Sequence, residues 1–330
     1  MSAPPLVAEL APGIFEIGSV FGARRLHQHL LVGDDGSAVL IDAGVAATPA
    51  ATLAPALAEV GVAPERLRWL VVTHPDADHQ GGAAALLALA PACGAACGFL
   101  DLPLVRDPEA LIRDRYRAYA REHALDLDAA ELAEVRAISG APVEIDLALF
   151  GGEALSLPGR RLLVHRLPGH SAGHLAIEDA ASGTLLMADA VHGRRSPALD
   201  GGPALPPTYE DVDAYEQTIA RVRALAPRLL ASGHMPALSG AEIAAFLDDS
   251  AAFVAELDAL LLRRADAAVA AAGVTLAELC AAADAAFGPF AAGPAMLRFA
   301  VHGHVRRLVE RGALAAVDLL RTPRRYVSTS

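Results

Sequence analysis

Lysine is absent from this sequence of 330 residues, so all 27 basic residues are arginine. Aspartate and glutamate together number 39, which gives a net charge of −12. A protein that binds nucleic acid over a broad surface needs a basic footprint, and this balance argues against that class. The acidity is uneven, because residues 246–330 hold nine arginines and nine acids and are neutral as a whole.

Cysteine is also scarce, with only Cys93, Cys97 and Cys280 in the chain. The first two have a C-x3-C spacing, which is not that of a zinc finger, and buried small apolar residues are the simpler interpretation. No basic residue precedes Arg24 and no apolar segment typical of a signal peptide opens the chain. An odd number of cysteines without an export signal leads us to expect a cytoplasmic protein.

Long apolar runs are few, and the one that could suggest a membrane helix is residues 81–100, which carry no charge. This run is mostly alanine and glycine and is interrupted by Pro91, so we expect a buried helix followed by a buried strand. The chain is 54% hydrophobic and 20% charged, which indicates a folded protein with a large core. Its length suits about two domains.

One short stretch, residues 71–82 with the sequence VVTHPDADHQGG, concentrates metal-binding side chains. An apolar run typical of a buried strand precedes it, and a run rich in alanine and leucine, typical of a helix, follows it. The alternative is a polar loop in which an aspartate caps the helix. However, two imidazoles and two carboxylates that leave one turn in different directions can serve two metal ions, and we favour that interpretation. The candidate ligands are His74, Asp76, Asp78 and His79.

Three further motifs follow in the chain, PGHSAGH at 168–174, LLMADA at 185–190 and LLASGH at 229–234. Together with the first, this ordered set resembles the metallo-β-lactamase superfamily, in particular its glyoxalase II-like and lactonase-like hydrolases. The first motif is similar to the family's H-x-H-x-D-H signature, with Asp76 in place of the second histidine. The resemblance covers roughly residues 10–245 and implies an α/β fold, a four-layer αββα sandwich.

The resemblance also implies how the ligands are divided between two metal ions. His74, Asp76 and His170 would hold the first ion. Asp78, His79 and His234 would hold the second, and Asp189 would bridge the two. It implies two divalent ions, with zinc favoured. A carboxylate at Asp76 adds negative charge and is a harder ligand, so manganese and iron are alternatives.

The function that the resemblance implies is a dinuclear metal-dependent hydrolase that attacks an ester, thioester or lactone through a metal-bound hydroxide. Asp78 would also orient the water. One alternative is a non-haem di-iron oxidoreductase, although the family branches of that kind carry a flavin domain and nothing in this sequence resembles one. Another alternative is a regulatory or nucleic-acid-binding protein that uses its C-terminal part.

Several residues near these motifs are left with open roles. Tyr116, His174 and His192 are candidates for contacting the substrate. In the family, an acid equivalent to Asp42 supports the metal site from outside, but Asp42 is as well explained by a turn or a helix cap.

Two units and an insertion are expected along the chain. Residues 1–245 would form the catalytic domain, with a helical insertion at about 101–140 that roofs the active site. Residues 246–330, with three helices starting near Ser250 and a hairpin, resemble a small winged-helix-like domain. We expect it to cover the active site or to form a homodimer. The expected partner is a small-molecule substrate, with no membrane contact and no nucleic acid.

Overall fold

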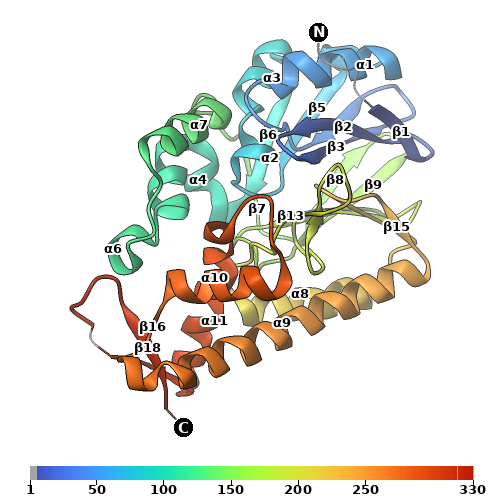
Figure 1. Ribbon diagram of the computed structural model, residues 1–330. Coiled ribbons are helices and arrows are strands. Elements are labelled where there is room, and N and C mark those ends of the chain that lie inside the picture. The colour runs from blue at the N-terminus through green and yellow to red at the C-terminus, as the bar shows by residue number, and fades with distance from the viewer. Residues whose placement is uncertain (1–5, 318, 330) are drawn as a thin grey trace.

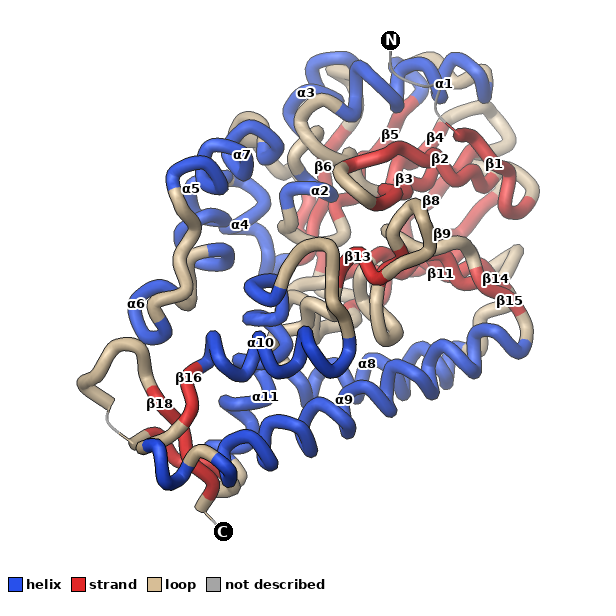
Figure 2. The backbone as a smooth tube through the Cα atoms, in the orientation of Figure 1, coloured by secondary structure: helices blue, strands red, loops and turns tan. Residues whose placement is uncertain are grey.

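Two β-sheets face each other, with helices on both outer sides, in the computed structural model of the protein (Figures 1 and 2). The structure describes residues 6–317 and 319–329. The expected mixed α/β fold is confirmed, and its four layers are helices, sheet, sheet and helices.

The first sheet has seven strands in chain order. Its first four strands are antiparallel, and the strands from β4 to β7 run parallel. The central strands are buried on both faces, which explains why their sequences are apolar runs rather than alternating patterns. The strands are β1 (Leu6–Ala11), β2 (Ile14–Phe21), β3 (Arg24–Val32), β4 (Ala38–Ile41), β5 (Leu67–Val72), β6 (Gly94–Gly98) and β7 (Leu147–Leu149).

The second sheet has six strands in the order β15-β14-β11-β10-β9-β8. The pair β11 and β14 is parallel, and the other pairs are antiparallel. Its strands are β8 (Ala154–Leu157), β9 (Arg160–Arg166), β10 (Leu175–Asp179), β11 (Thr184–Ala188), β14 (Leu229–Ser232) and β15 (Leu238–Ser239). A short separate pair consists of β12 (Ser196–Pro197) and β13 (Pro203–Leu205).

The core between the sheets consists of aliphatic side chains from both inner faces. Val39, Ile41 and Val71 of the first sheet belong to one cluster with Val164 and Ile177 of the second. Burial of such side chains is the main stabilising term of a two-sheet fold, at roughly 25 cal/mol per Å² of apolar area. This packing holds the ends of β4, β5, β11 and β14 in fixed positions.

Helices cover the outer faces of both sheets. The first sheet is covered by α1 (Ala54–Val60) and α3 (Ala83–Leu89), and the second by α8 (Val212–Leu225). The uncharged run at 81–100 is thus a buried helix followed by the buried strand β6, as predicted. No helix within residues 6–317 and 319–329 has the length and apolar character needed to cross a lipid bilayer.

The helical insertion lies beside the sheets in Figure 1, in teal and green. It contains α4 (Leu102–Arg106), α5 (Pro108–Leu111), a π-helical turn (Ile112–Tyr116), α6 (Ala120–His123) and α7 (Ala129–Ser139). A capping box opens α7, because the Asp128 carboxylate accepts from the backbone of Glu131 and the Glu131 side chain accepts from the backbone of Asp128.

The C-terminal unit follows the order helix, strand, two helices and two strands. It comprises α9 (Ala241–Ala267), β16 (Val274–Thr275), α10 (Leu276–Phe287), α11 (Arg298–Glu310), β17 (Leu314–Ala316) and β18 (Arg325–Ser328). The predicted start of its first helix near Ser250 was wrong, because Gly240, with a φ of 54°, turns the chain from β15 directly into α9. The likeness to a winged-helix domain stays a prediction.

The C-terminal unit shares its core with the catalytic part of the chain. Leu257 of α9 and Val305 of α11 belong to the same buried cluster as Tyr215 of α8 and Met187 of β11. The buried Arg307 of α11 also forms ion pairs with acids on α8 and α9. The expected domain boundary at 245/246 lies inside α9, so this helix joins the two parts without a linker.

Candidate metal centre

The seven predicted ligands come from four places at one edge of the two sheets. His74, Asp76, Asp78 and His79 follow β5, and the last two lie in the short helix α2 (Ala77–Gln80). His170 follows β9, Asp189 directly follows β11, and His234 lies two residues after β14. Residues far apart in the chain therefore meet because the strands that precede them end at the same edge of the two facing sheets.

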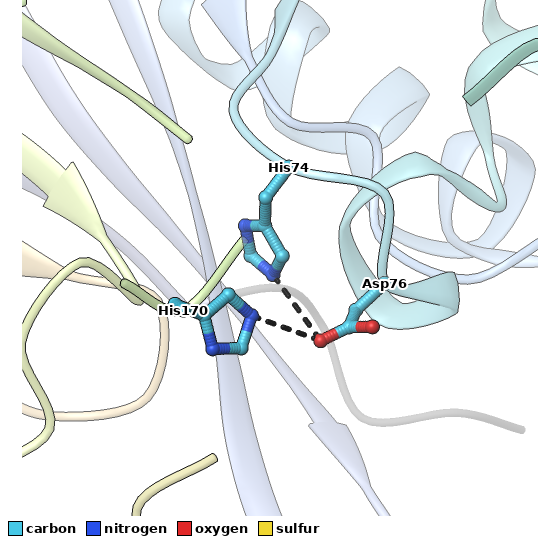
Figure 3. Close-up of side chains that lie close together, drawn as sticks. All are labelled: His74, Asp76 and His170. Carbon is cyan, nitrogen blue, oxygen red and sulfur yellow. Dashed lines mark hydrogen bonds and ion pairs between the residues drawn. The ribbon is translucent and has the colours of Figure 1, made fainter. Parts of the chain in front are cut away.

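The side chains form three overlapping groups whose nitrogen and oxygen atoms lie within 4.8 Å of one another. Figure 3 shows the first group, in which the imidazoles of His74 and His170 point toward one carboxylate oxygen of Asp76. The Nε2 atoms lie 3.8 Å (His74) and 2.9 Å (His170) from that oxygen. The groups are His74, Asp76 and His170; His74, His79 and Asp189; and Asp78, His79 and His234.

Asp189 lies close to candidate ligands of both predicted metal sites. Its Oδ2 atom is 3.1 Å from Nε2 of His234 and 3.7 Å from Nε2 of His79. The neighbouring Gly233 leaves room for these side chains, since a Cβ atom there would lie 2.6 Å from the carboxylate of Asp189 and 2.6 Å from the ring of His79. Any other residue at this position would push two predicted ligands apart.

The chemistry of these donors fits divalent metal ions. The Nε2 atom of His74 is buried and has no hydrogen-bond partner among the described residues, so its lone pair is directed into the group without a proton to satisfy it. Burial lowers the pKa of His74 well below its usual value, which keeps the ring neutral and able to coordinate. Burial opposes ionisation of Asp189, but the adjacent imidazoles of His234 and His79 hold its pKa well below the usual range.

Asp42 orients one of the predicted ligands from outside. Its carboxylate accepts a hydrogen bond from Nδ1 of His79 at 2.8 Å and others from the backbone and hydroxyl of Thr73. Because Nδ1 of His79 donates to Asp42, Nε2 is left to face the metal centre. Asp42 also has a φ of 63°, a strained value that the surrounding structure must hold in place. Asp42 was open to two roles, an acid that supports the metal site or a turn or cap residue. Its contacts with His79 and Thr73 are those of the supporting acid.

The loop that carries His170 is held in a similar way. Gly169 has a φ of 129°, and a Cβ there would lie 2.7 Å from Cα of Tyr215, so this bend requires glycine. Asp101 accepts from the hydroxyl of Ser171 at 2.5 Å and from the backbone of Gly173 at 2.8 Å. The role of Asp101 was not predicted, because its partners are about seventy positions away along the chain and no local pattern links them.

Arg115 is the main residue of the centre that sequence reasoning did not place. It is almost completely buried and donates from Nε to Oδ1 of Asp76 at 2.5 Å and from Nη2 to Oδ2 at 2.8 Å. A second acid, Glu210, lies 3.0 Å from its Nη1 atom. Asp76 was expected to add negative charge to the first metal site, and the guanidinium of Arg115 offsets part of that charge.

The three candidates for substrate contact lie in different places. Tyr116 lines the cavity beside the metal ligands, and its hydroxyl accepts from the backbone of Ala77 at 2.9 Å. His174 stacks on His74 with ring centroids 4.9 Å apart, and Nε2 of His192 lies 3.2 Å from Nδ1 of His170. The last two histidines lie behind predicted ligands and are not among the residues that line the cavity.

The cavity has a volume of about 560 Å³ and three walls. The turn between β2 and β3 forms one wall, the insertion forms the second through Tyr116 and α7, and the C-terminal unit forms the third through residues 291–299. Asp76, Asp78, Asp189 and His234 form its floor. A ligand in this cavity would therefore contact the metal centre and both accessory parts of the chain.

A comparison of the sequence with protein families agrees with this arrangement of ligands at one edge of two facing sheets. The family model of the metallo-β-lactamase superfamily matches residues 27–234. The chain belongs to this superfamily. No curated protein matches its sequence.

Solved structures show that the fold of this metallo-β-lactamase superfamily member is shared along almost its whole length. A metallo-β-lactamase family protein from Thermus thermophilus is 23% identical and aligns over 97% of this chain and 100% of its own, with a TM-score of 0.73. A β-lactamase domain protein from Burkholderia ambifaria is 18% identical, with coverage of 100% and 97% and a TM-score of 0.74. The metal-soaked flavodiiron core Flv1 from Synechocystis is 13% identical, with coverage of 79% and 63% and a TM-score of 0.55.

The supporting role of Asp42 predicts a loss of metal affinity in Asp42→Asn. Asparagine tolerates a positive φ, so the backbone is retained, but the charge that accepts from His79 is lost. We expect metal affinity to fall by roughly 10- to 100-fold, as is typical for such outer partners. Competition with a chromophoric chelator measures this. Asp35→Asn, in an exposed turn, makes the same change of charge and serves as the control. Equal affinities in the two variants would show that Asp42 does not support the site.

The ion pair between Asp76 and Arg115 predicts that Asp76→His alone destabilises the protein. The variant leaves a buried guanidinium with Glu210 as its remaining carboxylate, and loss of a buried charge partner costs about 3 kcal/mol. We expect the midpoint of thermal unfolding in chelator to fall in Asp76→His and to recover in Asp76→His/Arg115→Met. The double variant should also take up more zinc relative to manganese. If the single variant is as stable as wild type, the ion pair is not structurally important.

Proposed function

We propose that this protein is a metal-dependent hydrolase that cleaves an ester, thioester or lactone with water as the nucleophile. The observation that carries the proposal is the convergence of seven candidate ligand side chains, four of which form the floor of a cavity with largely apolar walls. A cavity of this size and composition is typical of a small-molecule site. Zinc, manganese and iron are all compatible with the mixed imidazole and carboxylate donors.

The proposed use of water agrees with the position of the cysteines. None of the three lines the cavity, and all are buried. Burial raises the pKa of Cys93 to about 11 and the pKa values of Cys97 and Cys280 to about 12. Their thiols remain protonated near neutral pH and are poor nucleophiles.

Two divalent ions bound by these residues would activate a water molecule and polarise the acyl oxygen of the substrate. The contribution of Asp78 is to receive and orient the attacking water. Arg24 donates to its Oδ2 atom at 2.8 Å, which fixes the carboxylate at the cavity floor and leaves Oδ1 to accept from a water. Burial opposes ionisation, but the nearby guanidinium of Arg24 lowers the pKa of Asp78, so it stays a hydrogen-bond acceptor.

In this proposal Tyr116 is the proton donor, and it acts on the side of the reacting bond opposite the attacking water. Its hydroxyl oxygen accepts from Ala77, and its own proton has no acceptor among the described residues. Burial, together with the carboxylates of Asp76 and Asp78, raises the pKa of Tyr116 well above its usual value. The hydroxyl therefore keeps its proton and can donate it to the oxygen that leaves or becomes negative.

A di-iron oxidoreductase is a second candidate because one ligand position holds the carboxylate Asp76. The pairing of that carboxylate with Arg115 weakens this argument, since it offsets the added charge. A nucleic-acid function of the C-terminal unit has less support. Four arginines of the C-terminal unit that could contact nucleic acid form ion pairs within the chain, namely Arg306, Arg307, Arg324 and Arg325.

Assays of protein reconstituted separately with zinc, manganese and iron test the proposal. Aryl esters, thioesters and lactones would be assayed for hydrolysis, and oxygen consumption would be followed with a chemical reductant. We expect hydrolysis of at least one acyl class, lost after chelation and restored by metal. Oxygen reduction by the iron form, with no hydrolysis by any form, would contradict the proposal and favour the oxidoreductase.

The role of Tyr116 predicts a lower turnover in Tyr116→Phe. We expect kcat to fall by roughly 100-fold for an ester with an alkyl alcohol, because that leaving oxygen needs a proton. The loss should be much smaller for a nitrophenyl ester, whose leaving group departs as an anion. Metal content should not change. Tyr119→Phe removes a hydroxyl that contacts Glu210 outside the cavity and is the matched control. An equal loss for both esters would mean that Tyr116 is not the proton donor.

A further inference from the structure

Arg298 is a buried cation that the proposed mechanism does not use. It is the first residue of α11, it lines the same cavity as the metal ligands, and only 7% of it is exposed. Its Nη1 atom donates to the carbonyl of Ala295 at 2.9 Å, and its Nε atom is buried without a hydrogen-bond partner among the described residues. No carboxylate of the described part of the chain forms an ion pair with it.

The other two buried arginines differ from Arg298 in this respect. Arg115 pairs with Asp76 and Glu210, and Arg307 pairs with three acids on α8 and α9. A guanidinium taken out of water without a counter-charge is costly, by several kcal/mol per ion. Arginine also keeps its proton in proteins, so it cannot escape this cost by becoming neutral. An unpaired buried arginine on a cavity wall is therefore a site that a ligand anion would complete.

The surroundings of Arg298 connect it to the metal centre. Its guanidinium lies over the ring of Phe299 at 4.7 Å, and the guanidinium of Arg115, which binds Asp76, lies 5.2 Å from the same ring. The ring of Phe299 thus contacts both Arg298 and Arg115, and Arg115 pairs with the candidate ligand Asp76. The adjoining wall is apolar, with Ala295 and Met296 from the segment that leads into α11.

Two further acids that line the cavity form no ion pair with Arg298. Glu131 and Glu134 of α7 also line the cavity, but both are exposed. The Glu131 carboxylate accepts from the backbone of Asp128 in the capping box, and neither acid forms an ion pair with Arg298. The charges of Asp76 and Asp78 are already paired with Arg115 and Arg24. The guanidinium of Arg298 therefore has no carboxylate in direct contact within the described part of the chain.

We propose that Arg298 binds a carboxylate or phosphate group on the substrate, so that the protein cleaves acyl compounds that carry a negative charge at the end remote from the reacting bond. This inference rests on the proposed hydrolase function for its description of the substrate. It gives the C-terminal unit a role in specificity, because this unit supplies the arginine. It also agrees with the apolar wall, along which the uncharged part of the substrate would lie.

Three thioesters test the inference in the metal-loaded protein. The S-phenyl thioesters of hexanoic acid, adipic acid and 5-phosphonopentanoic acid differ only in the group at the remote end. We expect wild type to favour one or both charged substrates in kcat/KM. The ratio of charged to uncharged kcat/KM should fall by roughly 10- to 100-fold in Arg298→Gln, as for loss of a hydrogen-bonded ion pair. Arg298→Lys should retain part of the preference. The relative rates of the adipate and phosphonate compounds identify the preferred anion.

Arg306→Gln is the control, because Arg306 lies exposed on the same helix and does not line this cavity. It should leave the ratio unchanged. A wild type that hydrolyses all three thioesters equally would overturn the inference while leaving the hydrolase function intact. An Arg298→Gln variant that slows all three equally would also overturn it, because a structural role explains that result. If the variants fail to fold, the ratio of kcat/KM values in wild type still tests the inference, because equal values for all three thioesters would overturn it.

Binding without catalysis separates the two proposals. Isothermal titration of hexanoate and hexanamide into chelator-treated protein avoids any competing coordination of metal. We expect hexanoate to bind at least 10-fold more weakly to Arg298→Gln than to wild type, with hexanamide unaffected. If no thioester is cleaved but this difference is found, the anion site stands and the hydrolase proposal fails. If hexanoate binds both proteins equally, the anion site fails.

Discussion

The convergence of buried imidazoles on the Asp189 carboxylate is the constraint on which the rest of this structure depends. Three carboxylates and four histidines meet at one sheet edge, and four of these side chains come from a single turn. Like charges and unpaired lone pairs at such distances are unfavourable unless cations join them. The two-sheet core provides the rigidity, because it holds four strand ends in register from opposite sheets. Rigid strand ends are better than loops for holding ligands in a fixed geometry.

A second set of residues directs these ligands without touching the cavity. Asp42 fixes the ring of His79, and a backbone carbonyl at Arg25 accepts from Nδ1 of His234, so that both Nε2 atoms face the centre. Arg115 has a different effect, because it adjusts charge rather than direction. Its pairing with Asp76 makes the unusual carboxylate electrically closer to the neutral histidine that the family has at this position. The insertion therefore contributes to the metal centre itself as well as to the cavity wall.

The structure bears out the features that local patterns predict. The capping boxes of Asp128 with Glu131 and of Thr275 with Glu278 depend on contacts within one helical turn, so the local sequence marks these two helix starts. The candidate ligands were proposed from the ordered motifs and their resemblance to the family, and the structure brings their side chains together at one edge of the sheets. The start of α9 was missed because the residues after Gly240 are mostly alanine and charged side chains, a pattern that does not mark the first turn.

Contacts between distant segments could not be predicted in the same way. The pairing of Arg115 with Asp76 joins residues 39 positions apart, and nothing distinguishes Arg115 from the other arginines of its helix until the insertion is folded. The unpaired state of Arg298 is still less visible, since it depends on where every acid lies. The shared core of α8, α9 and α11 likewise joins two parts that the sequence suggests are separate.

Metal stoichiometry tests the central claim most directly, which is that these residues hold two ions that share one carboxylate. Elemental analysis after reconstitution and removal of free metal gives the number of ions per chain. The arrangement predicts two ions per chain in wild type. It predicts a marked loss of both together in Asp189→Ala, because that residue is common to the two sites. One ion or fewer in wild type, or loss of only one ion in the variant, would contradict the account.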